Sequence, residues 1–402
     1  MIFSIMMRTN ALNKLLKTFP SCAKRPLCTN AVNVNDIEIN YTRKRKMKAW
    51  HIHSYGSLDE VKLSEKYRTP FISHPKDVLV KVNAASVNPI DVAMLGGYGS
   101  TLLNIMRCSE IEFPLCLGRD FCGTIVDVGQ EVNRKICPGQ NVWGVVPVHL
   151  QGCHAEYVLV PDNCIALKPD YLSDVEAASI PYAGLTAWNA LFSICSTLTS
   201  GHGPRGKKVL VLGAAGGVGS LAVQMLAAEK VNVIAVCSSD AMEYVSKLGV
   251  SDVLDYTATD FSQSIFDKGP FDIIFDCAGL GPQGAGKYPW KYLSYITLSS
   301  PMLRNTDELG MLAGMVKNIS NLLEPNIESY SSGQGLIHWA FFRPSLEGLI
   351  YLRELVCSEK LKPYVNEVFP FDNIPEAYKK VLGGHMRGEE ISNFFSFNQP
   401  LR

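Results

Sequence analysis

Several common features are missing from the 402-residue sequence, and each absence excludes a class of protein. The net charge is zero, because 38 basic residues balance 38 acidic ones, so we expect no nucleic-acid partner. The apolar runs are shorter than the ~20 residues that a membrane-spanning helix needs. The 12 cysteines form no C-x-x-C pair and no metal-ligand spacing. Reduced, mostly buried thiols therefore fit the composition better than a disulfide scaffold does.

Acidic side chains are also missing from the first 35 residues, whose basic residues are Arg8, Lys14, Lys17, Lys24 and Arg25. The apolar residues that repeat there at helical spacing are Leu12, Leu15, Leu16 and Phe19. This pattern is typical of a mitochondrial transit peptide, which we assign to residues 1–40. The alternative is a disordered basic tail. A transit peptide predicts that the protein is mitochondrial, and the matrix is the compartment we expect.

The remaining chain is long enough for about two domains, and its pattern changes once along its length. Residues 47–171 read as short strands broken by proline and glycine, which is typical of a small β-barrel-like domain. Residues 172–342 alternate between strand and helix, which predicts a doubly wound parallel sheet. The strands expected in this second domain are Val209–Leu212, Val231–Val236, Val253–Tyr256, Phe271–Asp276 and Tyr295–Leu298.

The segment Asn305–Leu323 reads as an apolar helix, with Asn305 and Glu308 spaced like a capping pair. Its apolar residues cover more than one narrow stripe. We interpret them as core or subunit contacts, and the alternative is an entry surface for a long isoprenoid tail or a membrane-surface contact.

The most informative stretch is Val209–Gly219, where a β-branched run leads into four glycines and then into a helical pattern. Strand, tight turn and helix in this order are the context of a dinucleotide-binding fingerprint. Glycines allow the backbone to approach a pyrophosphate, whose charge is met by free N–H groups at the helix N-terminus. We therefore predict cofactor contacts from Gly213, Ala215, Gly216, Gly217, Val218 and Gly219. No Tyr-x-x-x-Lys pair accompanies the turn, unlike in single-domain short-chain dehydrogenases.

Together with Ser86–Asp91, Pro114–Gly123 and Ile180–Trp188, this turn resembles the zinc-free quinone oxidoreductases of the medium-chain dehydrogenase/reductase superfamily. The resemblance implies a GroES-like β-barrel substrate domain over residues 47–171, completed by residues 343–402, and a Rossmann domain over 172–342. It also implies hydride transfer from NADPH to a quinone, linked to ubiquinone metabolism. By the same resemblance, the residues expected to contact the cofactor further along the chain are Phe342, His385, Met386 and Arg387.

The chain departs from the zinc-containing members of this superfamily. They carry Gly-His-Glu where this sequence has Gly118-Arg119-Asp120, so a cation replaces a neutral metal ligand. The cysteine ligand expected near Asp91 and the four-cysteine structural lobe are missing too. Since a catalytic zinc needs about three protein ligands, we predict no metal.

The end of the second strand bears on the choice between NADPH and NADH. NAD-specific folds place a carboxylate there, but this sequence reads Cys237-Ser238-Ser239. Nothing at that position repels a 2′-phosphate, and Tyr256 ends the third strand, where the family contacts the same group. We therefore predict NADPH, with contacts from Cys237, Ser238 and Tyr256. NADH stays an alternative because Asp240 lies nearby.

The residues expected by resemblance to line the substrate slot are Asn88, Asp91, Tyr98, Arg119 and Thr186. Tyr98 or Arg119 would stabilise oxyanion charge on the acceptor. The alternative for Arg119 and Asp120 is a structural ion pair. Thr186 is expected beside the nicotinamide, and its alternative is a helix cap. The sequence singles out no proton donor.

Two other functions stay open at this stage. The same hydride step would serve an enoyl thioester or enal reductase. A rival of another class is a nicotinamide-binding interaction protein, with little turnover, whose partner is a reticulon-type membrane protein. The sequence does not indicate the oligomeric state.

Overall fold

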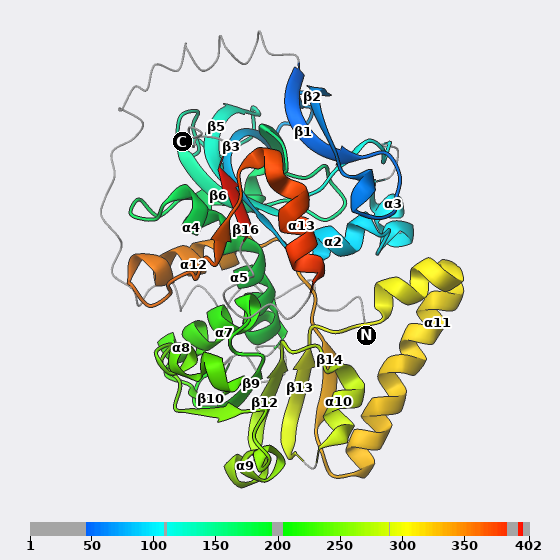
Figure 1. Cartoon of the computed structure of the whole chain (residues 1–402), viewed down its shortest axis with the longest axis vertical. Coiled ribbons are helices and arrows are strands. Elements are labelled where there is room, and N and C mark those ends of the chain that lie inside the picture. Colours follow the sequence, from blue (N-terminus) through cyan, green and yellow to red (C-terminus); the bar gives the residue numbers. More distant parts are fainter. Residues whose placement is uncertain (1–45, 108–110, 195–203, 289, 384–392, 397–402) are drawn as a thin grey trace.

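The structure is a computed structural model that describes residues 46–107, 111–194, 204–288, 290–383 and 393–396. It contains two domains, which Figure 1 shows one above the other. The predicted transit peptide lies outside the described residues. Within the described part of the chain, no helix is both long and apolar enough to cross a membrane.

A mainly antiparallel sheet forms the first domain, with the strand order β15-β16-β3-β5-β6-β8 and with β7 also paired to β3. A smaller sheet has the order β2-β1-β4. The strands are β1 Lys46–Ile52, β2 Lys62–Arg68, β3 Asp77–Val87, β4 Leu115–Cys116, β5 Asp120–Val128, β6 Asn141–Val145, β7 Tyr157–Pro161, β8 Ile165–Leu167, β15 Glu367–Val368 and β16 Asn393–Ser396. Helices α2 (Pro89–Leu95) and α3 (Ser100–Arg107) follow β3.

The second domain is built on a parallel sheet whose described strands have the order β11-β10-β9-β12-β13-β14. They span β9 Lys208–Leu212, β10 Asn232–Cys237, β11 Asp252–Asp255, β12 Phe271–Asp276, β13 Tyr292–Thr297 and β14 Leu336–Trp339. The helices between them are α7 Gly217–Ala228, α8 Met242–Ser246, α9 Phe261–Lys268, α10 Gly281–Lys287 and α11 Met302–Ser331. The order reverses beside β9, which is where dinucleotides bind in such sheets. The predicted fold class is confirmed.

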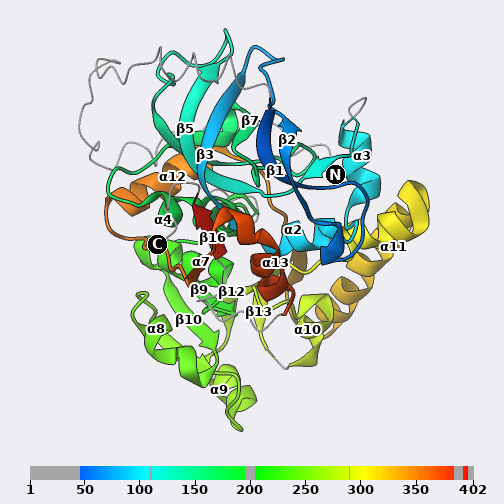
Figure 2. The ribbon, with the colours of Figure 1, turned by 45° about the horizontal axis from the view of Figure 1, so that its top comes forward.

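Helix α5 (Pro181–Trp188) connects the two domains after the short α4 (Asp174–Ala178). It continues as a π-helical turn over Asn189–Ile194 and is almost entirely buried between α7 and the first domain. Residues beyond β14 form α12 (Leu346–Cys357) and α13 (Ile374–Leu382), and then β16 pairs with β3. Figure 2 shows α13 and β16 lying against the first domain. The C-terminal elements thus return to the larger sheet of the first domain.

Helix α11 differs from the predicted segment Asn305–Leu323. It begins at Met302, and the non-helical backbone of Gly310 (φ 76°, ψ 172°) divides it into two helices. Asn305 is not a cap, because its side chain is buried and its Nδ2 donates to Oδ1 of Asn318 at 2.7 Å. Most of its apolar residues are exposed in the single chain and so do not belong to its core, while the subunit contact named beside the core stays a prediction.

Candidate active site

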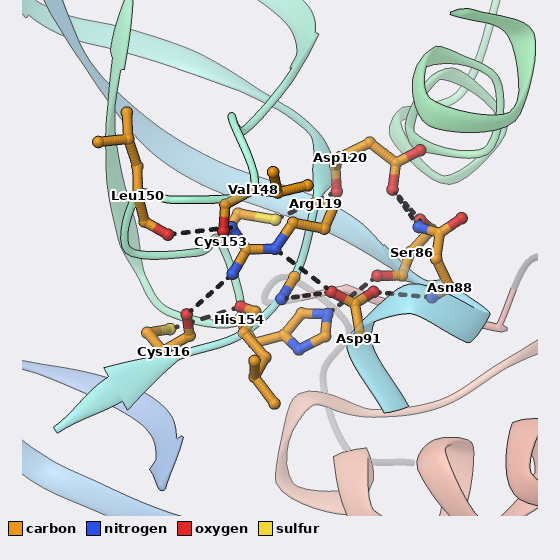
Figure 3. Close-up of polar contacts among 12 residues, drawn as sticks. Ser86, Asn88, Asp91, Cys116, Arg119, Asp120, Val148, Leu150, Cys153 and His154 are labelled. Carbon is orange, nitrogen blue, oxygen red and sulfur yellow. Dashed lines mark hydrogen bonds and ion pairs between the residues drawn. The ribbon is translucent and has the colours of Figure 1, made fainter. Parts of the chain in front are cut away.

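A buried polar cluster occupies the first domain where α2 meets β5 (Figure 3). Asn88 precedes α2, and its backbone N–H donates to Oδ2 of Asp91 at 2.8 Å. The other oxygen of Asp91 accepts from the backbone of Gly118 at 2.9 Å and lies 3.6 Å from Nε of Arg119. Both charged side chains are fully buried. The predicted residues Asn88, Asp91 and Arg119 are therefore brought together.

Arg119 is surrounded by backbone carbonyl groups and not by open space. Its guanidinium donates to the carbonyls of Pro147 at 3.1 Å and Leu150 at 2.9 Å, and Nη2 donates to that of Cys116. A fully buried group with these partners is not placed to reach a substrate. The geometry thus favours the structural ion pair over the oxyanion role, but the partner is Asp91 and not the expected Asp120.

Asp120 points the other way from Arg119 and joins the cluster to the interdomain helix. Its carboxylate accepts from the hydroxyl of Ser86, from Nδ2 of Asn88 at 2.8 Å and from the backbone of Tyr182 at 3.0 Å. Burial raises the pKa of Asp120 to about 7, while the hydrogen bonds from Ser86 and Tyr182 oppose that shift. The bond to Tyr182 fixes the first turn of α5 against the first domain.

His154 closes the cluster on the side of the C-terminal helix α13. Its Nδ1 lies 2.8 Å from the hydroxyl of Tyr378, and its Nε2 lies 2.9 Å from the carbonyl of Ser86. Burial lowers the pKa of His154 and so favours the neutral ring. Among the described residues, no three His, Cys, Asp or Glu side chains are arranged to hold a metal ion.

Two further tyrosines, Tyr98 and Tyr182, interact electrostatically with each other, and Tyr182 also interacts with the charged residues of the cluster. Tyr98 lies between α2 and α3 and is partly buried, and burial raises its pKa. Burial also raises the pKa of Tyr182, and the carboxylates of Asp91 and Asp120 add to that effect while Arg119 opposes it. Both groups therefore stay protonated at neutral pH and act as hydrogen-bond donors.

The ring of Tyr182 also contacts the second domain. It stacks on Phe342, which follows β14, with ring centroids 4.1 Å apart and planes 26° apart. Tyr182 thus joins the buried cluster of one domain to a predicted cofactor contact of the other. Sequence reasoning did not select Tyr182, although its position after Pro181 at the start of a buried helix was a usable signal. It also missed His154, which no local pattern marks.

Thr186 lies one turn further along α5. Its hydroxyl donates to the carbonyl of Tyr182 at 2.8 Å, and the side chain is 7% exposed. The bond lies within the helix and is not a cap. One lone pair of the hydroxyl stays available to a neighbouring ligand, so the nicotinamide contact stays a prediction.

The glycine turn has the geometry that a pyrophosphate requires. Gly213 has a left-handed backbone (φ 73°), and α7 begins at Gly217 after the N-cap Gly216. A Cβ on Gly219 would lie 2.1 Å from the carbonyl oxygen of Gly213, so only glycine lets α7 pack this close to the turn. Ala215 and Val218 are partly exposed beside it. The first N–H groups of α7 have no partner within the helix and are free to bind an anion.

The end of β10 carries the residues predicted to select the cofactor. Cys237 is buried and pairs in register with Asp255 of β11, while Ser238 is partly exposed. Burial raises the pKa of Cys237 to about 11, and Asp255 and Asp240 add to the effect. Tyr256 follows β11 and is 58% exposed, and its backbone donates to the carbonyl of Cys237 at 3.1 Å. His385, Met386 and Arg387 lie outside the described residues.

This pairing of a GroES-like barrel with a Rossmann sheet is that of the medium-chain dehydrogenase/reductases. The family model of the alcohol dehydrogenase GroES-like domain matches residues 74–170, and that of the zinc-binding dehydrogenases matches residues 248–391. Among solved structures, the quinone oxidoreductase from Coxiella burnetii is 27% identical, with a TM-score of 0.67 over 88% of this chain and 99% of that chain.

Two curated relatives define the family more narrowly. A Drosophila melanogaster protein named NAD(P)H oxidoreductase RTN4IP1, mitochondrial, is 44% identical over 86% of this chain and 86% of its own length. A Caenorhabditis elegans protein named reticulon-4-interacting protein 1, mitochondrial, is 34% identical over 88% of this chain and 96% of its own length. The chain belongs to this RTN4IP1 family of NAD(P)H oxidoreductases, which use a nicotinamide cofactor.

Proposed function

We propose that the protein is a zinc-independent, NADPH-dependent quinone reductase of mitochondria. The observation that carries this proposal is the Tyr182–Phe342 stack, which connects the polar cluster of the first domain with the segment that follows strand β14 of the Rossmann sheet. A planar acceptor placed against these rings would lie beside hydroxyl donors and next to the cofactor turn. The likeness to a quinone oxidoreductase at 27% identity supports the same substrate class.

The residues present fit a dinucleotide. The left-handed Gly213 and the close packing at Gly219 hold the first turn of α7, with its unpaired N–H groups, against the glycine turn. Gly216, Gly217 and Val218 would hold the pyrophosphate, Cys237, Ser238 and Tyr256 the 2′-phosphate, and Thr186 and Phe342 the nicotinamide. When bound, the nicotinamide supplies a hydride to the acceptor.

The residues of this chain would then position the acceptor and supply one proton. A quinone needs no Lewis acid, because an electron-poor ring accepts hydride readily and only the oxygen requires a partner. The hydroxyls of Tyr98 and Tyr182 would donate to that oxygen as its charge develops. Hydride and one proton together convert the quinone into a hydroquinone. Arg119, which is held by carbonyls, would instead keep Asp91 and the 147–150 segment in place.

An acceptor panel tests the substrate class. Purified protein with NADPH is given short-chain ubiquinones, other quinones, enoyl thioesters and enals, and the loss of reduced-nicotinamide absorbance is followed. We expect turnover with quinones, unchanged by chelator, and no stoichiometric zinc by elemental analysis. Faster turnover of enoyl thioesters or enals would identify the protein as a reductase of those compounds and not of quinones. One zinc per chain would overturn the metal-free mechanism.

We place the protein in the mitochondrial matrix, since the N-terminus has transit-peptide character and the relatives are named mitochondrial. We propose a role in ubiquinone metabolism, which the mitochondrial names of the relatives support. A reticulon-type partner is a second hypothesis, supported by the name of the Caenorhabditis elegans relative. Pull-down with the cofactor-loaded protein, compared with a variant that does not bind nucleotide, tests whether such binding depends on the active site.

A further inference from the structure

Helix α3 of the first domain begins without a cap of its own. The residue before it is Gly99, which has no side chain to accept from the first N–H groups of the helix, and its first turn contains no acidic residue. The cap comes from the second domain instead. Asp307 of α11 accepts from the backbone of Gly99 at 2.6 Å with one oxygen and from that of Thr101 at 3.0 Å with the other. One carboxylate thus holds the start of α3 across the domain boundary.

The same contact is also closely packed. Figures 1 and 2 both show the first half of α11, residues 302–309, beside α3. Gly99 has a left-handed backbone (φ 81°), and a Cβ there would lie 3.2 Å from Cδ1 of Leu303. A negative charge at the N-terminus of a helix also interacts favourably with the helix dipole. Packing, hydrogen bonds and charge therefore all favour this pairing of α3 with α11.

The first half of α11 is itself held by the second half, which follows the kink at Gly310. Nδ2 of Asn305 donates to Oδ1 of Asn318 at 2.7 Å, and Nδ2 of Asn318 donates to the carbonyl of Met302 at 3.1 Å. Gly314 packs so closely that a Cβ would lie 2.7 Å from the carbonyl oxygen of Asn305. Asp307 therefore belongs to a braced segment and not to a free loop.

The second half of α11 is fixed in turn to the Rossmann sheet. The side chain of Asn326 donates to the carbonyl of Ile337 at 3.0 Å and accepts from its backbone N–H at 2.8 Å. Ile337 belongs to β14, the strand that precedes Phe342. The end of the Rossmann sheet is thus connected to Tyr182 through Phe342 and to α3 through α11.

Tyr98 lies directly before the capped turn. Its backbone N–H donates to the carbonyl of Ala93 at 3.1 Å. Burial raises the pKa of Tyr98, while Arg304 lowers it and Asp307 raises it. Tyr98 also interacts electrostatically with Tyr182. The tyrosine is therefore within electrostatic range of the first half of α11 and of the other proposed donor.

We propose that Asp307 is a positioning residue, which holds Tyr98 at the acceptor site by capping α3 from the second domain. The proposal rests on the proposed function, since Tyr98 is one of the two hydroxyl donors assigned there. Asp307 would act on the reaction only through α3 and Tyr98. A donor that moves by about 1 Å can lose on the order of a hundredfold in rate, so the cap has a measurable effect on turnover.

The variant Asp307→Asn tests this effect, because it keeps the size of the side chain but leaves one of the two N–H groups without an acceptor. We expect kcat with quinone to fall on the order of tenfold. The dissociation constant of NADPH, measured by fluorescence titration, should not change, since the glycine turn lies apart from α11. Glu308→Gln is the matched control, because it removes the same charge from the next, exposed residue and should keep the parent kcat. A parent-like kcat in Asp307→Asn would overturn the proposal.

A double-mutant cycle separates positioning from a general effect on the fold. Tyr98→Phe is expected to lower kcat by about tenfold or more. In that background Asp307→Asn should change kcat by less than about twofold, because the group that it positions is already gone. Effects of the two changes that multiply, or a parent-like kcat in Tyr98→Phe, would contradict the role of Asp307. The cycle is run with whichever acceptor the parent reduces.

Hydrogen exchange of the full chain, followed by mass spectrometry, tests the contact without turnover. Peptides that cover residues 97–103 are expected to exchange about tenfold faster in Asp307→Asn than in Glu308→Gln, while peptides of α7 stay unchanged. Faster exchange in a protein that reduces no quinone would refute the proposed function and leave the contact in place. Equal exchange in the two variants would overturn the positioning contact whatever the substrate is.

Discussion

Tyr182 contributes two features to the proposed site, a hydroxyl group that can donate a hydrogen bond and a ring that stacks on Phe342. Its backbone is held by Asp120 and its ring lies on Phe342, while burial and the carboxylates of Asp91 and Asp120 raise the pKa of its hydroxyl. A donor with a high pKa supports oxyanion charge without losing its proton beforehand. At the scale of single residues, Tyr182 is therefore the position on which the proposed chemistry depends most.

Replacing Tyr182 by phenylalanine keeps the stack on Phe342 and removes only the donor. We expect kcat with quinone to fall on the order of a hundredfold, as for the loss of one oxyanion donor, with little change in KM. Steady-state kinetics with Tyr288→Phe, in the other domain, provide the control. An unchanged kcat for Tyr182→Phe would leave Tyr98 as the donor.

Cofactor choice rests on the end of β10. Cys237→Asp would place a carboxylate within a few ångströms of a bound 2′-phosphate, and at an effective dielectric of about 20 such a contact costs on the order of a few kcal/mol. We therefore expect the ratio of kcat/KM for NADPH over NADH to fall by more than tenfold, with Cys237→Ser as the neutral control. If the ratio is the same in parent and variant, the 2′-phosphate is not held at this strand end.

The residue scale is also where prediction from sequence was weakest. The motif around Arg119 and Asp120 suggested that these neighbours pair with each other. Arg119, however, directly precedes β5, whose first residue is Asp120, and the two side chains have different partners: Arg119 pairs with Asp91, while Asp120 accepts from Asn88 and Tyr182. Partners from α2 and α5 are set by tertiary packing, which no local pattern records.

At the scale of elements, the strand, glycine turn and helix around Gly213 could be predicted from the sequence alone. Strand β9, the turn and α7 form one contiguous local unit, and Gly213 and Gly219 each have a local reason for being glycine. The course of α11 could not be predicted from the sequence. Its kink at Gly310 and the exposure of its apolar residues arise because the second half of the helix packs against the first half. A periodic pattern of apolar residues predicts a buried helix face, but most apolar residues of α11 are exposed to solvent.

The turn gives the prediction at this scale. Ala215→Asp adds a negative charge beside the N-terminus of α7, and Gly217→Val fills the space of the pyrophosphate. Both variants are expected to weaken NADPH binding at least a hundredfold, measured by fluorescence titration, without a large change in melting temperature. Gly286→Val is the control, since a Cβ there meets no atom within 4 Å. Retained NADPH affinity in folded Gly217→Val protein would refute the assigned site.

At the scale of the whole molecule, buried histidines couple stability to pH. Burial lowers the pKa of His51, His154 and His338 below the usual histidine value of 6.5. The unfolded chain then binds more protons than the folded one below that pH, so these groups contribute stability above about pH 6.5 that is lost on acidification. Asp120, with its raised pKa, acts in the opposite direction between about pH 4 and 7.

We therefore expect His154→Gln to flatten the fall in unfolding free energy between about pH 7 and pH 5.5. Urea denaturation of parent and variant at a series of pH values measures this slope, and the difference removes the contribution of Asp120. Equal slopes would mean that His154 is as easily protonated in the folded chain as in the unfolded one.

The coupling of the two domains through α5 underlies the central claim, namely that nicotinamide oxidation and quinone reduction occur at one site. Anaerobic turnover with NADPH deuterated at the transferring position of C4 measures this most directly, with both products quantified. The account predicts one hydroquinone per NADPH consumed and a primary isotope effect on kcat, both lost in Gly217→Val protein. NADPH consumption without hydroquinone, or quinone reduction that persists in that variant, would contradict it.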